Sequence, residues 1–262
     1  WAVDRSRVLL TGLSDGATYA LLYGLREGAP CTALAPVSGV LHPANFANGN
    51  LERAAGRPIY LVHGALDWLF PVALARAAAE ELAIVPLMGD VSDPAAIGRL
   101  VRRITADRRR VDLLVHNASL LGPRVPLAEW PRRTFDEVLS VNVSAPFDLT
   151  RRLLDRLRDD ATVLFVSSGV TTAVRTDWGA YEVSKVAMER LAQIYAAELA
   201  DLGTTVVTVD PGRMRTRMRA AAYPAEDPKT LPTADGVASN MIALLEQIGP
   251  EDSGGRYDVG VR

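Results

Sequence analysis

Short apolar runs alternate with longer stretches of helical period along this chain, and this alternation constrains the fold more than any other feature. The runs are rich in Val, Ile and Leu throughout, as in strands buried on both faces of a sheet. Strands are expected at residues 7–11, 31–35, 59–62, 84–87, 113–116, 162–166 and 205–209, and helices at 18–26, 72–82, 95–105, 147–158 and 181–201. The order predicts an α/β fold, a doubly wound parallel sheet in a Rossmann-like three-layer sandwich, formed as a single domain over residues 1–262.

Charge and cysteine content exclude several classes of partner. The 262 residues include 29 Lys and Arg against 31 Asp and Glu, which gives no electrostatic footprint for nucleic acid or an anionic membrane. The longest apolar stretch, residues 70–89, is interrupted by charged residues, so no membrane span is expected. Cys31 is the single cysteine and cannot form an internal disulfide, which favours a reducing, cytoplasmic location.

Small and polar residues follow four successive predicted strands. They are Gly89-Asp90-Val91, Asn117-Ala118-Ser119, Ser167-Ser168-Gly169 and Asp210-Pro211-Gly212. Ligands of parallel sheets bind beyond the carboxyl ends of the strands, where small residues let the backbone approach and polar groups orient the ligand. Each segment alone is explained equally well as a turn, but four in series favour a binding crevice.

The segment Tyr181-Glu182-Val183-Ser184-Lys185 carries the sharpest chemical signal. Tyr181 and Lys185 are four residues apart and project from the same face of a predicted helix. A phenol with a pKa of roughly 10 is a poor acid or base near neutrality, but a neighbouring ammonium lowers that pKa and enables proton transfer. The alternative is a packed tyrosine beside a solvated lysine. Because the chain has 27 Arg and only two Lys, Lys185 and Lys229, its sequence favours a requirement for a compact ammonium.

Ordered motifs from about residue 84 onward resemble the short-chain dehydrogenase/reductase family. Ser168, followed thirteen residues later by Tyr181 and then by Lys185, matches its catalytic signature, and Asn142 matches its catalytic asparagine. The remaining matches are Asp90-Val91, Asn117-Ala118 with Ser119 in place of the family's glycine, and Pro211-Gly212 with Thr216 and Met218.

This resemblance implies an NAD- or NADP-dependent oxidoreductase that transfers a hydride between nicotinamide and a small carbonyl or alcohol substrate. Tyr181 would exchange a proton with the substrate oxygen, which Ser168 would hold. Lys185 would lower the pKa of the tyrosine and bind the nicotinamide ribose, and Asn142 would position a water. The cofactor would contact Gly12, Gly16, Asp90, Val91, Asn117, Ala118, Tyr181, Lys185, Pro211, Gly212 and Thr216. The predicted helices 147–158 and 181–201 resemble those through which family members associate, so a homodimer or homotetramer is expected.

The first 83 residues depart from this family. Gly12 and Gly16 fit its glycine-rich turn at a helix N-terminus, but Thr18 stands where the last glycine belongs. The same letters, Gly12-Leu13-Ser14-Asp15-Gly16, complete the G-x-S-x-G elbow that exposes the nucleophile of α/β-hydrolases. The stretch from His63 to Asp67 resembles the hydrolase segment that carries the triad acid, here Asp67.

A hydrolase triad also needs a base, and the chain offers a poor one. The only histidine after Asp67 is His116, at a strand end where packing explains it better. Without a base, Ser14 is a weak nucleophile. Residues 1–83 are therefore expected to resemble part of an α/β-hydrolase, and residues 84–262 the catalytic part of a short-chain dehydrogenase. Two alternatives stay open: an esterase-like serine hydrolase using Ser14 and Asp67, and a catalytically inactive chimeric α/β protein.

Overall fold

The computed structural model describes residues 9–13, 33–37, 62–63, 87–88, 90–106 and 110–260. The chain divides into two compact units, one formed by Trp1–Ala118 with Leu149–Ala161 and the other by Ser119–Asp148 with Thr162–Arg262. The four candidate catalytic residues all belong to the second unit. No helix in the described part of the chain is long and apolar enough to cross a membrane.

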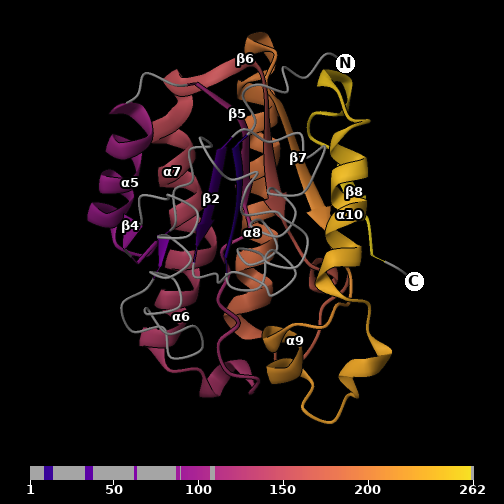
Figure 1. Ribbon diagram of the computed structural model, residues 1–262. Helices are drawn as coiled ribbons and strands as arrows, with labels where there is room; N and C mark the ends of the chain where they lie inside the picture. The colour runs from indigo at the N-terminus through magenta and orange to yellow at the C-terminus, as the bar shows by residue number, and fades with distance from the viewer. Residues whose placement is uncertain are drawn as a thin grey trace, which may run out of the picture. The chain divides into compact units, whose positions relative to one another are not determined.

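The first unit contains a parallel sheet with the strand order β1-β2-β3-β4. These strands are β1 (Leu9–Leu13), β2 (Ala33–Val37), β3 (Val62–His63) and β4 (Leu87–Met88), and β5 (Val111–His116) belongs to the same unit (Figure 1). The predicted parallel pairing is therefore confirmed for these strands. Gly12, expected in the turn after the first strand, instead lies within β1 opposite Pro36, because β1 continues to Leu13.

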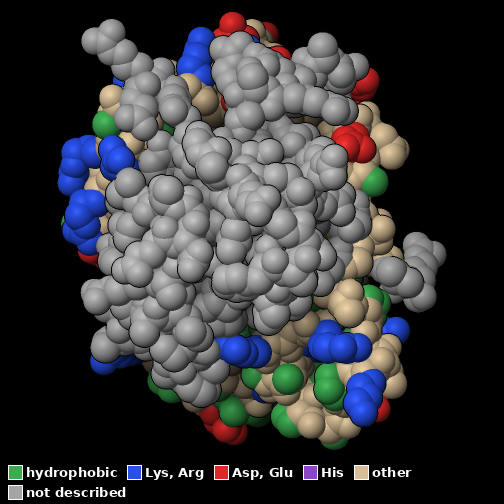
Figure 2. Space-filling view, viewed as in Figure 1, with side chains coloured by type: hydrophobic (Ala, Val, Ile, Leu, Met, Phe, Trp, Pro, Cys, Tyr) green, Lys and Arg blue, Asp and Glu red, His purple; other side chains and the backbone are tan. Residues whose placement is uncertain are grey.

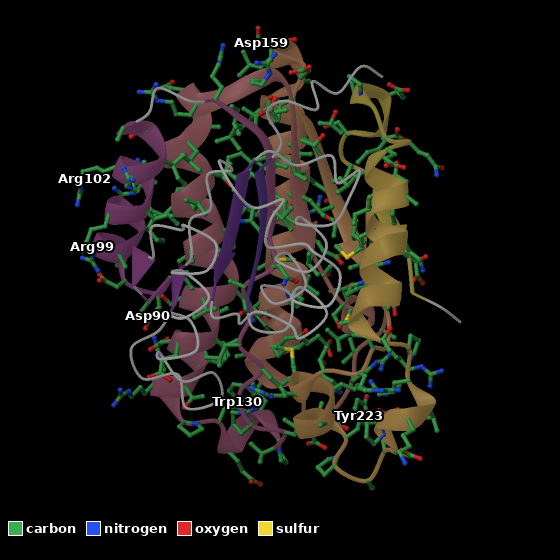
Figure 3. The ribbon with its side chains drawn as sticks, viewed as in Figure 1. Asp90, Arg99, Arg102, Trp130, Asp159 and Tyr223 are labelled. Carbon is green, nitrogen blue, oxygen red and sulfur yellow. The ribbon has the colours of Figure 1, made fainter. Side chains whose placement is uncertain are left out.

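Helix α5 (Pro94–Ala106) follows β4 and has one buried and one exposed face. Asp93 caps its N-terminus, accepting hydrogen bonds from the backbone N–H groups of Ala95 at 2.9 Å and Ala96 at 3.2 Å. Arg99 and Arg102 are exposed, and Figure 3 shows them pointing away from the helix on its outer side. Figure 2 shows basic side chains gathered over the position of this helix.

Strand β6 (Leu157–Val166) begins earlier than expected, because the predicted helix 147–158 is too long. Helix α7 (Ala145–Leu153) ends after nine residues and a short 3-10 turn, η3 (Leu154–Arg156), follows it. Arg110 donates a hydrogen bond to the Leu157 carbonyl at 2.9 Å, and Arg158 pairs with Asp112 at 3.1 Å. These long-range contacts hold the start of β6 extended, and local helical periodicity does not reveal them.

The second unit contains three parallel strands in the order β6-β7-β8. They are residues 162–166 of β6, β7 (Thr205–Asp210) and β8 (Arg256–Asp258), and the other helices of this unit are α6 (Arg132–Leu139), α8 (Gly179–Glu198), α9 (Arg217–Ala222) and α10 (Ala234–Leu245). Helix α8 packs against β7 and α6 (Figure 1). Phe165 and Met188 are at most 1% exposed in its core, and burying a side chain of this size stabilises the fold by about 1.5–3 kcal/mol.

A π-helical turn, η2 (Ser140–Ser144), joins α6 to α7 and is absent from the sequence prediction. Such turns are rare and concentrate at functional sites. This one carries Asn142, one of the candidate catalytic residues.

Candidate active site

Helix α8 holds Tyr181 and Lys185 on one buried face. Tyr181 is 6% exposed and Lys185 is 2% exposed, and the Lys185 ammonium lies 5.8 Å from the centre of the Tyr181 ring. The spacing alone left open that Lys185 is solvated. The structure rules out this alternative, because Lys185 is buried. Burying an ammonium is costly unless the group is hydrogen-bonded or paired with an opposite charge.

Lys185 donates one hydrogen bond, from Nζ to the Val166 carbonyl at the end of β6, at 2.8 Å. Burial lowers the pKa of Lys185 to about 8, because the charged form loses its hydration, while Glu189 and Asp210 partly offset this effect. Lys185 is consequently still mostly protonated at neutral pH, but it loses its proton only slightly above that pH.

Tyr181 has a raised pKa in this structure, because burial disfavours the phenolate. The hydroxyls of Ser168 and Ser119 act in the opposite direction, and the charge of Asp210 raises the pKa further. The sequence predicted a pKa lowered by Lys185. The net direction is the reverse, since desolvation outweighs every favourable contact, and Tyr181 is a neutral phenol at physiological pH.

Ser168 and its neighbour Ser167 have different partners. Ser168 begins a 3-10 turn, η4 (Gly169–Thr172), and its hydroxyl lies by that of Tyr181. The Ser167 hydroxyl instead donates a short hydrogen bond to a carboxylate oxygen of Glu189. The structure thus brings together Ser168, Tyr181 and Lys185, and it leaves Ser167 outside the group.

Asn142 is completely buried in η2, and its side chain ties two segments together. Its Oδ1 accepts from the Leu120 N–H at 2.7 Å, and its Nδ2 donates to the Leu120 carbonyl at 3.0 Å and to Ser184 Oγ at 2.8 Å. Ser184 Oγ in turn donates to the Tyr181 carbonyl at 2.7 Å. The side chain therefore fixes the loop after β5 to the first turns of α8, while the role of Asn142 in holding a water stays a prediction.

The loop after β7 requires its glycine. Gly212 has a φ of 69°, and a Cβ at this position would lie 2.7 Å from the Gly260 Cα. The Gly212 N–H donates to Asp210 Oδ1 at 2.9 Å, and Asp210 Oδ2 pairs with Arg256 at 3.1 Å. Thr216 caps α9 by accepting from the Arg219 N–H at 3.1 Å. A glycine is thus required at position 212 by the left-handed φ and by the close approach of the Gly260 backbone.

The other predicted cofactor residues belong to the first unit. Asp90 is exposed, and its Oδ1 accepts from the Ser92 N–H at 2.8 Å in the turn before α5. Val91, Asn117 and Ala118 are half-buried. Gly16 and the hydrolase candidates Ser14 and Asp67 lie outside the described residues.

His116 has the structural role that its position suggested. It is 6% exposed, and its Nε2 lies 2.7 Å from Thr150 Oγ1. Burial lowers its pKa to about 3, so the ring is neutral at physiological pH.

An apolar wall lies next to Tyr181. It consists of Leu121, Val170, Trp178, Tyr181 and Ala222, with Met218 and Tyr223 packed against it. The Trp178 and Tyr181 rings are 5.7 Å apart, and Arg124 lies 4.2 Å from the centre of the Trp178 ring. Figure 3 shows Tyr223 beside α9, in the segment that completes this wall. Tyr181 therefore lies beside an apolar surface.

The start of α8 is sterically demanding, which yields a prediction for stability. Gly179 has a φ of 36°, and a Cβ there would lie 2.3 Å from the Trp130 ring. Gly179→Ala is expected to lower the free energy of unfolding by about 2–4 kcal/mol, because backbone strain and a clash with a buried ring add. Urea denaturation measures this change.

Gly236 in α10 is the matched control. A Cβ there would lie 3.5 Å from Thr233 Oγ1, which is an ordinary contact. Gly236→Ala should leave stability unchanged or raise it by up to about 1 kcal/mol. Equal effects at the two glycines would contradict the importance of the close approach between Gly179 and Trp130.

Comparison with protein families finds two models that match this chain. The model of the short chain dehydrogenase family matches residues 71–227, more than half of the chain. The chain belongs to the short-chain dehydrogenase family. A second model, of the phospholipase/carboxylesterase family, matches residues 2–90 and supports the hydrolase-like N-terminal segment. The two matches overlap at residues 71–90, whereas the sequence analysis placed a boundary at residue 83.

Two curated relatives of this short-chain dehydrogenase are oxidoreductases by name. The oxidoreductase YciK of Escherichia coli K12 is 36% identical over 162 residues, which are 61% of this chain and 64% of that protein. An NADPH-dependent aldehyde reductase-like chloroplastic protein of Arabidopsis thaliana is 30% identical over 138 residues, 51% of each chain. The matched region therefore spans about half to two thirds of the length of these relatives.

Solved structures of the family share the fold. The structure of YciK from E. coli has a TM-score of 0.71 at 27% identity, covering 97% of both chains. A short chain dehydrogenase of Shigella flexneri complexed with NADP has a TM-score of 0.71 at 26% identity, covering 96% of both chains. The chain thus has the α/β Rossmann-like fold with a parallel sheet that its sequence predicted.

Proposed function

We propose that the chain is an NADP(H)-dependent oxidoreductase that interconverts a small carbonyl compound and its alcohol, using Ser168, Tyr181, Lys185 and Asn142. The observation that carries this proposal is the buried Lys185 ammonium on the same helical face as Tyr181, whose hydroxyl lies by that of Ser168. Related structures complexed with NADP and NADPH support the choice of nucleotide. When bound, the nicotinamide supplies or accepts the hydride.

The residues present fit a nicotinamide nucleotide. Within the described part of the chain, Lys185 donates one hydrogen bond, to Val166, and an ammonium has three donors. Donors remain for the hydroxyls of a ribose. The Pro211-Gly212 turn after β7 resembles the segment that flanks the nicotinamide in this family. We propose cofactor contacts at Gly12, Gly16, Asp90, Val91, Asn117, Ala118, Tyr181, Lys185, Pro211, Gly212 and Thr216.

The protonation state of Tyr181 suits carbonyl reduction. A neutral phenol gives its proton to the substrate oxygen as the hydride reaches the carbonyl carbon, so that the O–H bond of Tyr181 breaks and that of the product alcohol forms. Ser168 donates a hydrogen bond to the same oxygen, and Lys185 stabilises the phenolate that is left. In the reverse direction the phenolate takes the proton of the alcohol. The apolar wall excludes water, which strengthens each of these interactions.

Turnover of NADPH with a panel of aldehydes and ketones tests this function. The proposal expects consumption of NADPH that depends on the carbonyl compound and that saturates with it. No consumption with any member of the panel, by protein that is folded, would contradict it.

The match of residues 2–90 to phospholipases and carboxylesterases makes a hydrolase the second candidate. We expect the wild-type chain and Ser14→Ala to hydrolyse p-nitrophenyl esters at equal rates, because His116 is buried, neutral and paired with Thr150 and is no base for Ser14. A rate that falls to background in Ser14→Ala would instead favour the esterase-like alternative.

We also propose that the protein works in the cytoplasm as a homodimer or homotetramer, with residues 1–262 in one Rossmann-like domain. Three apolar side chains of α8 support association, since Val183, Val186 and Ile194 are 47–49% exposed along one stripe of the helix. Analytical ultracentrifugation tests the oligomeric state, and a monomer at micromolar concentration would contradict it.

The single cysteine agrees with the proposed location in a reducing compartment.

A further inference from the structure

The hydroxyl of Ser119 is buried and unsatisfied. Ser119 follows Asn117-Ala118 directly after β5, and its Oγ lies by the Tyr181 hydroxyl without a well-formed hydrogen bond to any residue that the structure describes. A buried hydroxyl without a partner is unfavourable, and native structures contain few of them. An unsatisfied group of this kind, beside a reactive side chain, calls for a functional explanation.

The position of Ser119 relative to Tyr181 is held by a continuous chain of hydrogen bonds. Asn142 binds both backbone groups of Leu120, the residue after Ser119, at 2.7 and 3.0 Å. Asn142 also donates to Ser184 Oγ at 2.8 Å, and Ser184 Oγ donates to the Tyr181 carbonyl at 2.7 Å. These hydrogen bonds are buried or part-buried, and they connect the residue after Ser119 to the helical turn that carries the phenol.

Two hydroxyls from different loops therefore lie by the phenol. Ser168 comes from the end of β6 and Ser119 from the loop after β5, and both favour the ionised form of Tyr181. Leu121, two residues after Ser119, packs against Tyr181 in the apolar wall. Tyr181 is 6% exposed, so a hydrogen bond formed to its hydroxyl is little weakened by competition with water.

We propose that Ser119 is a second catalytic serine, which donates a hydrogen bond to the Tyr181 oxygen as that oxygen becomes negative. This role rests on the proposed function, in which Tyr181 loses its proton to the substrate. Ser119 keeps its own proton, so the reaction needs no further reactant. Hydrogen bonds to an anionic oxygen are about twice as strong as those between neutral groups. The contact is consequently stronger in the transition state than at rest, which is the condition for accelerating the chemical step.

The same role explains why the Ser119 hydroxyl has no well-formed hydrogen bond while Tyr181 is still protonated. The neutral phenol of the resting protein is a weak acceptor, whereas the phenolate is a strong one. Glycine, which the family motif has at this position, offers no such donor. Ser119 thus supplements the stabilisation of the phenolate by Lys185, whose ammonium is reduced in population as the pH rises through about 8.

Three measurements on Ser119→Ala test the proposal. We expect kcat/KM for carbonyl reduction to fall by about tenfold to a hundredfold, the effect of one hydrogen bond to a charged group. We expect NADPH affinity to remain unchanged. The melting temperature should stay level or rise, because the substitution removes a buried hydroxyl without a partner. A serine with a merely structural role would instead lower the melting temperature and leave kcat/KM near the wild-type value, and that result would overturn the proposal.

A measurement that needs no turnover separates this proposal from the proposed function. 3,5-Difluorotyrosine, whose phenol is more acidic than that of tyrosine, is placed at position 181 and titrated by ¹⁹F NMR. Ser119→Ala should raise the midpoint by about one unit, the equivalent of a tenfold effect. Ser144→Ala, at an exposed serine of η2, is the control and should not move it. If Ser119→Ala shifts the titration midpoint but the protein does not oxidise NADPH, the Ser119 contact is retained and the proposed function is rejected. If the enzyme is active but the wild type and Ser119→Ala titrate with equal midpoints, the Ser119 contact alone is rejected.

Discussion

Tyr181→Phe is expected to lower kcat for carbonyl reduction by about 10²–10⁴-fold, because it removes the hydroxyl that gives the proton to the substrate. The ring remains in the apolar wall between Trp178 and Leu121, so packing is preserved. NADPH affinity should be largely unchanged, since Lys185 and the loop at Gly212 remain in place. Steady-state kinetics and a nucleotide titration on the same preparation measure both quantities.

Tyr223→Phe provides the control for removing a phenol hydroxyl in the same region. Tyr223 is half-buried, and its ring lies 6.0 Å from that of Trp178. The control variant should retain most of the activity. If Tyr181→Phe retained wild-type kcat, Tyr181 would not be the acid, whatever the spacing of the motif.

Lys185→Met is expected to lower kcat for carbonyl reduction by about a hundredfold or more and, unlike Tyr181→Phe, to weaken NADPH binding as well.

Burial of Lys185 also predicts that the stability of the folded protein depends on pH in an unusual way. The pKa of Lys185 is lowered by burial from 10.5 to about 8 in the folded protein. Between these values the unfolded chain holds the proton and the folded chain does not, so folding stability rises with pH. The rise amounts to about 3 kcal/mol and is complete near the unfolded pKa.

The arginine-rich composition makes this rise measurable. Lys229, the only other lysine, is exposed, and Lys229→Met is the matched control. Urea denaturation from neutral pH to about pH 10.5 should show the rise in the wild type and in Lys229→Met, and its loss in Lys185→Met. Curves with the same pH dependence for all three proteins would show that the Lys185 ammonium carries no burial cost.

Local patterns predicted the strands and the long helix but not their ends. β7 (Thr205–Asp210) is completely buried and rich in the β-branched residues Val and Thr, which is why its sequence identifies it directly. β8 (Arg256–Asp258) was missed, because its three residues are exposed or half-buried and have no apolar pattern. The early start of β6 depends on ion pairs such as Arg158 with Asp112, which are distant in sequence. Tertiary contacts of this kind override local propensity.

The candidate site was predictable to the extent that its residues have fixed spacings. The interval from Ser168 to Tyr181 and the four-residue step to Lys185 identified a group that the structure brings together. The direction of the Tyr181 pKa was predicted wrongly, because sequence does not give the extent of burial. The role that we propose for Ser119 was not predicted, although a serine where the family motif has glycine was visible in the sequence.

The central claim is that Tyr181 and Lys185 form a nicotinamide-dependent catalytic site. The most direct measurement is a titration of the wild-type chain and of Lys185→Met with NADPH, following the fluorescence of the nucleotide. The account predicts saturable binding to the wild type and clearly weaker binding to the variant. No binding to the folded wild-type chain at millimolar nucleotide, or equal affinity for the two proteins, would contradict it.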